Sequence, residues 1–282
     1  MNVHAIQTGT VAVKPSQPDG GGHRRRSFAR VLADRGWTGE LPILAWLVEH
    51  PEGLIVVDTG ETARATKPGY FTPWHPYFRL GLREWVRPDQ EIGPQLRRLG
   101  FAPDDVRWVV ITHLHTDHAG GLGHFPHSEI VTSRRAFEEA RGLAGKMRGF
   151  LPQHWPDGFS PTLVDFEAGA FGPFRTSTRL TGAGDVHLVP TPGHTGGHLS
   201  VAVEDGETVL LLAGDASYTQ SLMLEGRSDG VSPRPRQTVE TLTRIQRLAA
   251  ERPTVYLPSH DPLSVARLAT RQTVSPATGA VA

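Results

Sequence analysis

The stretch Thr112-His113-Leu114-His115-Thr116-Asp117-His118-Ala119-Gly120-Gly121 decides the fold class of this chain. It places four candidate metal ligands within six residues, after an apolar run that has the length of a buried strand. His113 and His115 lie two apart, so an extended backbone projects both imidazoles to one side. Asp117 and His118 follow as the chain turns at the glycines, which aims them at a second point. The pattern predicts two adjacent metal sites.

Three further candidate ligands each follow an apolar strand: His194 after residues 186–189, Asp215 after residues 209–214 and His260 after residues 254–259. Burying an unpaired charge is costly, so Asp215 needs a cation or hydrogen-bond donors. The predicted ligand sets are His113, His115 and His194 for one ion, Asp117, His118 and His260 for the other, and Asp215 bridging both. Each ion then keeps an open position, as catalytic zinc requires, and nitrogen with oxygen ligands suits zinc or a similar divalent ion. The alternative for each residue alone is a hydrogen-bonded core or loop side chain.

This order of His-x-His-x-Asp-His, Gly-His, strand-end Asp and strand-end His resembles the metallo-β-lactamase-fold hydrolases over residues 40 to 268. The resemblance implies an α/β fold, a four-layer αβ/βα sandwich with the metals at one edge of two sheets. Lactamases commonly use a cysteine ligand, and di-iron members a glutamate where this chain has His115; this chain has no cysteine. These two differences from the lactamases and the di-iron members favour the hydrolytic branch, which binds two divalent ions. Zinc is the expected ion, and cobalt, manganese or iron are also compatible.

The segment Gly214-Asp215-Ala216-Ser217-Tyr218-Thr219 is similar to that of the N-acyl homoserine lactonases, the quorum-quenching lactonases. In these enzymes a tyrosine three residues after the bridging aspartate reaches the substrate, so the resemblance implies this role for Tyr218. The alternative is a tyrosine that caps a helix or fills a gap. Thr116 stands where these lactonases often carry a pocket-lining aromatic, which leaves the acyl-chain preference open.

The expected reaction is opening of the lactone ring of N-acyl homoserine lactones, or similar lactones, by a metal-bridging hydroxide. Metal coordination lowers the pKa of water from about 15.7 to about 7. Tyr218 would help to polarise the carbonyl, and Asp117 would carry the proton to the leaving alkoxide. The alternatives on the same centre are a glyoxalase II-like thioesterase, a phosphotriesterase or an arylesterase. A non-catalytic binding protein of the same fold is disfavoured because all seven ligands are present.

With 282 residues the chain is expected to form a single domain, 1–282, because no stretch marks a boundary. We expect a flexible loop near 14–36, an aromatic loop or lid at 63–90 and a frayed tail after 270. Hydrophobic periodicity predicts strands at 43–48, 54–57, 199–203 and 208–213, and helices at 90–99, 134–141 and 237–250. The aromatic residues of 68–88 either pack a loop on the core or line an acyl pocket or dimer contact, with 147–159 as the opposite wall.

Composition excludes several classes of partner. Lys plus Arg and Asp plus Glu number 29 each, so the formal net charge is zero, which argues against nucleic acid. No apolar run reaches the roughly 18 residues of a membrane span, and the N-terminus lacks the apolar core of a signal peptide, so a cytoplasmic location is expected. The expected partner is a small-molecule lactone with an acyl tail, and the resemblance leaves a homodimer open.

Overall fold

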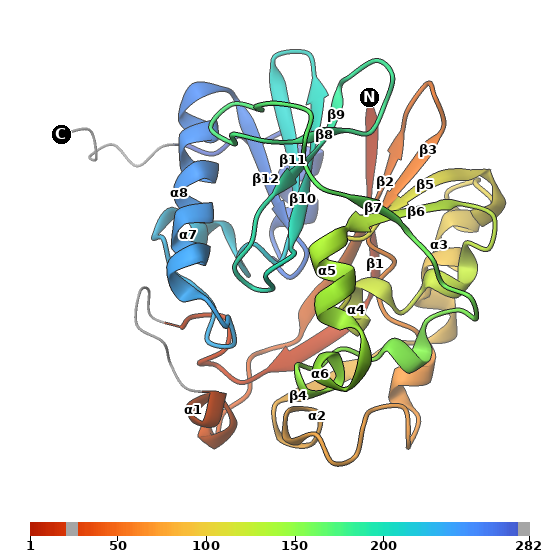
Figure 1. Ribbon diagram of the computed structural model, residues 1–282, viewed down its shortest axis with the longest axis vertical. Coiled ribbons are helices and arrows are strands. Elements are labelled where there is room, and N and C mark those ends of the chain that lie inside the picture. Colours follow the sequence, from red (N-terminus) through yellow and green to blue (C-terminus); the bar gives the residue numbers. More distant parts are fainter. Residues whose placement is uncertain (21–27, 276–282) are drawn as a thin grey trace.

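The computed structural model describes residues 1–20 and 28–275, which form two mixed sheets packed face to face with helices outside (Figure 1). The seven-stranded sheet, in the order β4-β1-β2-β3-β5-β6-β7, contains β1 (Asn2–Val13), β2 (Leu41–Glu49), β3 (Leu54–Val57), β4 (Leu82–Trp85), β5 (Val106–Val110), β6 (Glu129–Ser133) and β7 (Thr162–Val164). The five-stranded sheet, in the order β12-β11-β10-β9-β8, contains β8 (Thr178–Arg179), β9 (Val186–Pro190), β10 (Leu199–Asp205), β11 (Thr208–Gly214) and β12 (Thr254–Pro258).

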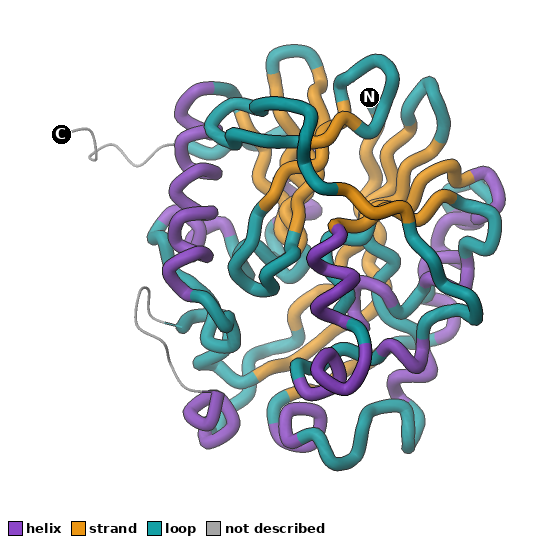
Figure 2. The backbone as a smooth tube through the Cα atoms, viewed as in Figure 1, coloured by secondary structure: helices purple, strands orange, loops and turns teal. Residues whose placement is uncertain are grey.

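Short helices cover the outer faces of the sheets and the edge where strands end (Figure 2). They are α1 (Phe28–Ala33), α2 (Pro76–Leu80), α3 (Ile92–Arg98), α4 (Thr116–Ala119), α5 (Arg134–Ala140), α6 (Gly142–Met147), α7 (Gln220–Leu224), α8 (Pro235–Glu251) and α9 (Ser264–Ala269). Single 3₁₀ turns are η1 (Ala63–Thr66), η2 (Pro88–Gln90), η3 (Pro103–Asp105), η4 (Leu122–His124) and η5 (Pro152–His154). The expected four-layer αβ/βα sandwich is confirmed.

The apolar core has one central layer and two outer ones. Trp46 and Val110 from one sheet meet Leu212 from the other in the central layer, and all three side chains are buried. The outer layers pack α3 on the larger sheet and α8 on the smaller. The apolar face predicted for residues 237–250 is confirmed, because Leu242, Ile245 and Leu248 are fully buried.

β1 is the longest of the strands that the sequence did not predict; the others are β4, β6, β7 and β8. It pairs antiparallel with both β2 and β4, so the N-terminal segment lies inside the larger sheet. Its apolar residues do not alternate regularly, and the pairing register shifts between Gln7 and Gly9. A bulge of this kind moves the side chains that follow to the other face, which breaks the period-2 pattern that predicts strands.

Segments expected to be loops contain regular structure where they are described. Within 14–36 the chain forms α1, and residues 21–27 lie outside the described residues. The 63–90 stretch forms η1, α2 and β4. The tail is ordered beyond 270, since Val274 is buried and its N–H donates to the Thr254 carbonyl at 2.8 Å. The rest of the expected frayed tail, 276–282, is not described.

Parallel pairing brings the predicted ligands to one place. β3, β5 and β6 run parallel in the larger sheet, and β11 and β12 run parallel in the smaller. The carboxyl ends of parallel strands lie at the same edge of a sheet, which is where open sheets bind ligands. None of the helices in the described ranges combines the length and hydropathy needed to cross a membrane.

We expect Leu212→Ala to lower the free energy of unfolding by about 2–5 kcal/mol. The side chain is fully buried between the sheets, so its removal loses apolar contacts and leaves a cavity. Urea unfolding of the metal-loaded protein would measure the loss. The control is Leu263→Ala, a side chain that is 63% exposed, expected to change stability by less than about 0.5 kcal/mol. Equal effects of the two substitutions would contradict this assignment of the core.

Candidate metal centre

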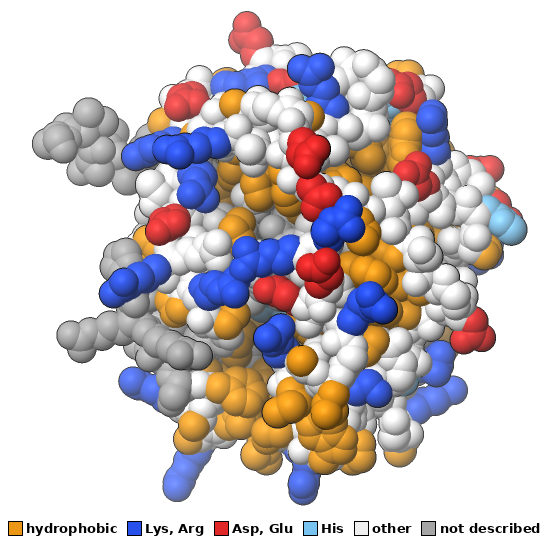
Figure 3. Space-filling model, viewed as in Figure 1, with side chains coloured by type: hydrophobic (Ala, Val, Ile, Leu, Met, Phe, Trp, Pro, Cys, Tyr) orange, Lys and Arg blue, Asp and Glu red, His pale blue; other side chains and the backbone are white. Residues whose placement is uncertain are grey.

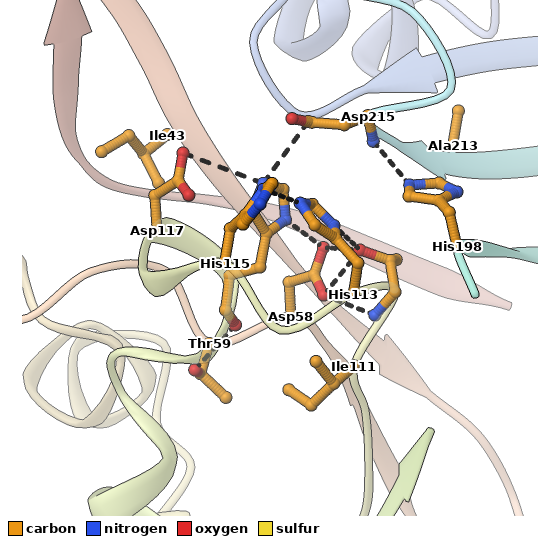
Figure 4. A network of polar contacts seen from close by, with 12 residues as sticks. Ile43, Asp58, Thr59, Ile111, His113, His115, Asp117, His198, Ala213 and Asp215 are labelled. Carbon is orange, nitrogen blue, oxygen red and sulfur yellow. Dashed lines mark hydrogen bonds and ion pairs between the residues drawn. The ribbon is translucent and has the colours of Figure 1, made fainter. Parts of the chain in front are cut away.

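The seven predicted ligands all lie just beyond strand ends. His113 and His115 follow β5, and α4 carries Asp117 and His118 in its first turn. The other three are His194 after β9, Asp215 after β11 and His260 after β12. The structure brings their donor atoms together in three groups, each within 4.8 Å: His113-His115-His194, His113-His118-Asp215 and Asp117-His118-His260. Figure 4 shows Asp117 and Asp215 turned toward the histidines.

Two clusters of donor atoms are distinct. In the first, His115 Nδ1 lies 3.0 Å from His113 Nε2 and 3.0 Å from His194 Nε2. In the second, Asp117 Oδ2 lies 3.3 Å from His260 Nε2 and 3.9 Å from His118 Nε2. These clusters are the two ligand sets that the sequence predicts.

Asp215 stands between the two clusters and offers one oxygen to each. Its Oδ1 lies 3.4 Å from His118 Nε2 and 3.3 Å from His260 Nε2. Its Oδ2 lies 3.4 Å from His194 Nε2, in the other cluster. A carboxylate in this position can bridge two cations, which is the role that the sequence analysis expects of it.

The ring nitrogens that face away from the centre are held by acceptors. His118 Nδ1 lies 2.8 Å from Asp58 Oδ2, and His260 Nδ1 donates to the Pro42 carbonyl at 2.8 Å. His194 Nδ1 lies 3.4 Å from Asp229 Oδ2. Such partners fix the ring and its tautomer, leaving Nε2 as the metal-binding atom.

Two buried atoms at the centre contact ion-pair partners but make no hydrogen bond. Among the described residues, His118 Nε2 and Asp215 Oδ1 are buried and accept or donate no hydrogen bond. Unpaired buried polar groups are rare because they are costly. A pair of divalent cations would satisfy both atoms, so the residues present fit such ions.

The charges of the cluster point to a cation. Burial alone would raise the pKa of Asp117, but His118 and His260 hold it at about 2. Burial opposes a charge on His260, but Asp215 and then Asp117 raise its pKa to about 10. Without metal, therefore, protons on histidines compensate the buried carboxylates at neutral pH. Burial and then His194 lower the pKa of His115 to about 3, so this ring is already neutral.

Backbone geometry at two strand ends supports the site. Gly214 has φ +54°, and a Cβ there would lie 2.7 Å from His198 Nε2, so only glycine fits before Asp215. Asp58 also has a positive φ, 59°, after β3. Its carboxylate accepts from the N–H and hydroxyl of Thr112 as well as contacting His118. These contacts fix the loop that carries His113.

A cavity of about 480 Å³ opens beside the ligands. Four of the ligands, His115, Asp117, His194 and Asp215, line it together with Tyr218. Apolar walls come from Phe28, Phe78, Leu82, Met147 and Phe150. The 68–88 stretch therefore contributes a pocket wall. Met147 and Phe150 of the expected opposite wall also line the cavity, whereas Trp155 and Phe159 pack on the core.

Exposed apolar side chains lie on α1, on the 68–88 stretch and on α6, and two of them, Phe28 and Met147, line the cavity. Trp74 is 55% exposed, Leu80 53%, Leu143 69% and Met147 66%. Figure 3 shows hydrophobic side chains gathered on this part of the surface, at the lower edge of the view. The wall of the cavity is thus continuous with an apolar surface.

Thr116, at the position where the lactonases often carry an aromatic, takes part in a buried polar network. Its hydroxyl lies 2.8 Å from the Tyr70 hydroxyl, which donates to Glu61 Oε1 at 3.0 Å. Tyr70 in turn stacks on His154 with ring centroids 4.1 Å apart. Burial raises the pKa of Glu61 to about 7. Thr116 lines the cavity and Tyr70 does not, so Tyr70 holds the Thr116 hydroxyl from behind.

Sequence reasoning missed several residues that support the ligands. Asp229 lies in a loop with no strand or motif beside it, so no signal in the sequence identified it. His198 lies inside a segment that resembles the lactonases, but its role differs from that of a ligand. Its Nε2 accepts from the Asp215 N–H at 2.9 Å and its Nδ1 lies 2.8 Å from Thr191 Oγ1, which fixes Asp215.

Comparison with known proteins agrees with this geometry. Residues 38–260 match the metallo-beta-lactamase superfamily. The N-acyl homoserine lactonase AttM of Rhizobium radiobacter is 30% identical over 236 residues, covering 79% of this chain and 83% of AttM. The probable metallo-hydrolase Rv2300c of Mycobacterium tuberculosis is 34% identical over 188 residues, covering 64% of this chain and 58% of that protein.

Solved structures share the fold. An N-acyl homoserine lactone hydrolase with the product N-hexanoyl-L-homoserine bound at its catalytic metal centre has a TM-score of 0.73 and 23% identity, covering 92% of this chain and 93% of that one. AidC, a dizinc quorum-quenching lactonase in complex with its product, has a TM-score of 0.60 and 14% identity, covering 92% and 87%.

Asp58→Asn should weaken metal binding about 10- to 100-fold, because an amide holds His118 in place less firmly than a carboxylate does. Metal content after dialysis against a weak chelator would show the loss. Asp185→Asn is the matched control. Asp185 Oδ1 lies 3.0 Å from Nε2 of the buried His50, and neither residue belongs to the donor clusters. Equal metal retention by both variants would contradict the role of Asp58.

Zinc affinity should rise with pH between pH 6 and 8. The pKa of His260 is about 10 without metal, so its ligand nitrogen carries a proton throughout this range, and zinc must displace that proton. Linkage gives a rise of roughly tenfold per pH unit for each proton displaced. Competition titrations, corrected for zinc hydrolysis, would measure this slope, and a flat profile would contradict the charge assignment.

Proposed function

The chain belongs to the metallo-beta-lactamase superfamily, and on that premise we propose that it is a dinuclear-metal hydrolase that opens the lactone ring of N-acyl homoserine lactones or similar lactones. The observation that carries the proposal is the place of Tyr218, whose side chain lines the same cavity as Asp117 and Asp215. The relatives named above support it, since AttM is a lactonase of this kind.

The seven ligands would hold two divalent ions, with His113, His115 and His194 at one, Asp117, His118 and His260 at the other, and Asp215 between them. When bound, such ions supply an activated water as nucleophile and polarise the carbonyl of the substrate. We favour zinc because imidazole and carboxylate ligands suit it, and because AidC, which has the same fold, is a dizinc enzyme.

Tyr218 can donate a hydrogen bond to the ring carbonyl oxygen. Its ring stacks on His260 with centroids 5.4 Å apart, which holds the phenol beside the centre. Burial, with a further contribution from Tyr77, raises its pKa well above the ordinary value. The phenol therefore keeps its proton at neutral pH. A donor placed where negative charge develops lowers the barrier to ring opening.

Asp117 can move the proton that the reaction transfers. Its carboxylate is ionised at neutral pH, since its pKa is about 2, and it lines the cavity. It can accept a proton from the attacking water and deliver it to the ring oxygen as the carbon–oxygen bond breaks. The product is an open-chain hydroxy acid.

The apolar cavity walls suit the acyl tail. Phe78, Leu82 and Phe150 lie on the same cavity as the ligands, so a substrate with a polar ring and an apolar chain can place each part in a matching environment. The homodimer and the cytoplasmic location expected from the sequence stay predictions.

A substrate panel tests the assignment of activity. We expect turnover of N-hexanoyl homoserine lactone, measured by acid release on ring opening, to exceed that of S-lactoylglutathione, paraoxon and phenyl acetate, and to be lost with chelator. Faster turnover of the thioester, the phosphotriester or the aryl ester would favour the corresponding alternative hydrolase and overturn the lactonase assignment.

Tyr218→Phe should lower kcat about 100- to 1,000-fold, the usual effect of removing one donor to a developing oxyanion. Bound metal should stay at the wild-type level, because the phenol is not a ligand. Tyr256→Phe is the matched control: Tyr256 is also buried and its hydroxyl contacts Ser217 at 2.8 Å, but it does not line the cavity. Loss of metal from Tyr218→Phe would show a structural role instead.

A further inference from the structure

Two tyrosine hydroxyls on the cavity are joined by one buried amide. Gln17, which follows β1, is 2% exposed, and its Nε2 lies 2.8 Å from the Tyr77 hydroxyl and 2.8 Å from the Tyr218 hydroxyl. The two hydroxyl oxygens therefore lie within twice that distance of each other. All three residues line the same cavity as Asp117 and Asp215.

The amide leaves both phenol protons available. A glutamine nitrogen has two hydrogens and no lone pair to offer, so each phenol oxygen accepts one hydrogen bond from Gln17. Among the described residues, neither the Tyr77 nor the Tyr218 hydroxyl has another hydrogen-bond partner. An ordinary phenol, with a pKa of about 10, keeps its proton at neutral pH. Each O–H can then donate into the cavity.

We propose that Gln17, Tyr77 and Tyr218 form a two-donor binding site for an N-acyl α-amino lactone, in which Tyr218 binds the ring carbonyl oxygen and Tyr77 binds the amide carbonyl oxygen. The inference rests on the proposed lactonase function and names its substrate class more narrowly. In such a lactone only two atoms separate the two carbonyl carbons, so their oxygens are spaced closely enough to meet two hydroxyls held by one nitrogen.

The assignment of the two tyrosines follows from their surroundings. Tyr218 stacks on the metal-cluster residue His260 and lies three residues after Asp215, so it serves the reacting carbonyl. Tyr77 lies in α2, beside Phe78, where the apolar wall of the cavity begins. Tyr77 therefore donates to the amide carbonyl oxygen, which is the polar group nearest the apolar tail. Gln17 contacts neither oxygen of the substrate, and it acts as a positioning residue.

The first experiment compares two lactones with similar tails, N-hexanoyl homoserine lactone and α-octyl-γ-butyrolactone, which lacks the amide. Tyr77→Phe should lower the ratio of kcat/KM for the amide lactone to that for the alkyl lactone about tenfold, mainly through KM, the effect of one lost hydrogen bond. The Tyr256→Phe control should keep the wild-type ratio. An unchanged ratio in Tyr77→Phe would overturn the assignment of Tyr77.

A binding measurement separates recognition from turnover. The dissociation constant of N-hexanoyl homoserine lactam, in which nitrogen replaces the ring oxygen, should rise about tenfold in Tyr77→Phe by calorimetry. Wild-type protein that hydrolyses neither lactone would refute the proposed function itself. Hydrolysis of both, with equal effects of Tyr77→Phe on each, would refute only the two-donor site.

The second experiment tests whether Gln17 acts as a donor. Gln17→Glu keeps the shape but presents a carboxylate, which accepts both phenol protons and withdraws them from the substrate. We expect kcat/KM for the amide lactone to fall at least 100-fold, whereas full activity in Gln17→Glu would overturn the donor role. Melting temperature and metal content report whether the variant is folded.

Epistasis distinguishes positioning from a structural role. Gln17→Met should lower kcat/KM about tenfold or more in the wild-type background, but less than twofold in the Tyr77→Phe/Tyr218→Phe background, because the hydroxyls through which it acts are gone. Equal losses in both backgrounds would show that Gln17 only supports the fold, and would overturn its role as a positioning residue.

Discussion

The position of the Asp215 carboxylate, one oxygen toward each cluster of imidazoles, is the constraint on which the site depends. A buried carboxylate with an oxygen that accepts no hydrogen bond is costly, and histidines from both sheets surround it here. Gly214 is needed to place it, since any Cβ there would meet His198. The parallel pairing of β11 with β12 then brings His260 to the same edge.

Side chains and a carbonyl outside the donor clusters hold the histidines in place. Asp58, Asp229 and the Pro42 carbonyl each hold the outer nitrogen of one histidine, so the inner nitrogens converge before any ion binds. Preorganised donors of this kind lose little freedom on binding. The same buried carboxylates keep protons on the histidines when metal is absent, which couples metal affinity to pH.

The cavity combines a polar end with an apolar wall because it is built from both halves of the chain. The loop after β11 of the smaller sheet supplies Asp215 and Tyr218, whereas the 68–88 stretch, which contains β4, supplies Tyr77 and Phe78. Gln17 joins the two halves through its amide. Substrate recognition, in this view, depends on contacts between segments up to 201 residues apart in the sequence.

The sequence by itself determined the α/β sandwich, the amphipathic face of α8 and all seven residues of the donor clusters, because strand periodicity and histidine spacing are local properties. It left open which residues support those ligands. Asp229 and Gln17 carry no local pattern, and the contact of Gln17 with Tyr77 of the aromatic stretch exists only once distant loops meet. β1 was missed for a related reason. Its residues do not alternate regularly, and it is a strand because it pairs with β2 and β4, which are distant or unpredicted segments. Only the tertiary structure could decide these features, because hydrogen bonds between remote segments leave no periodicity in the chain.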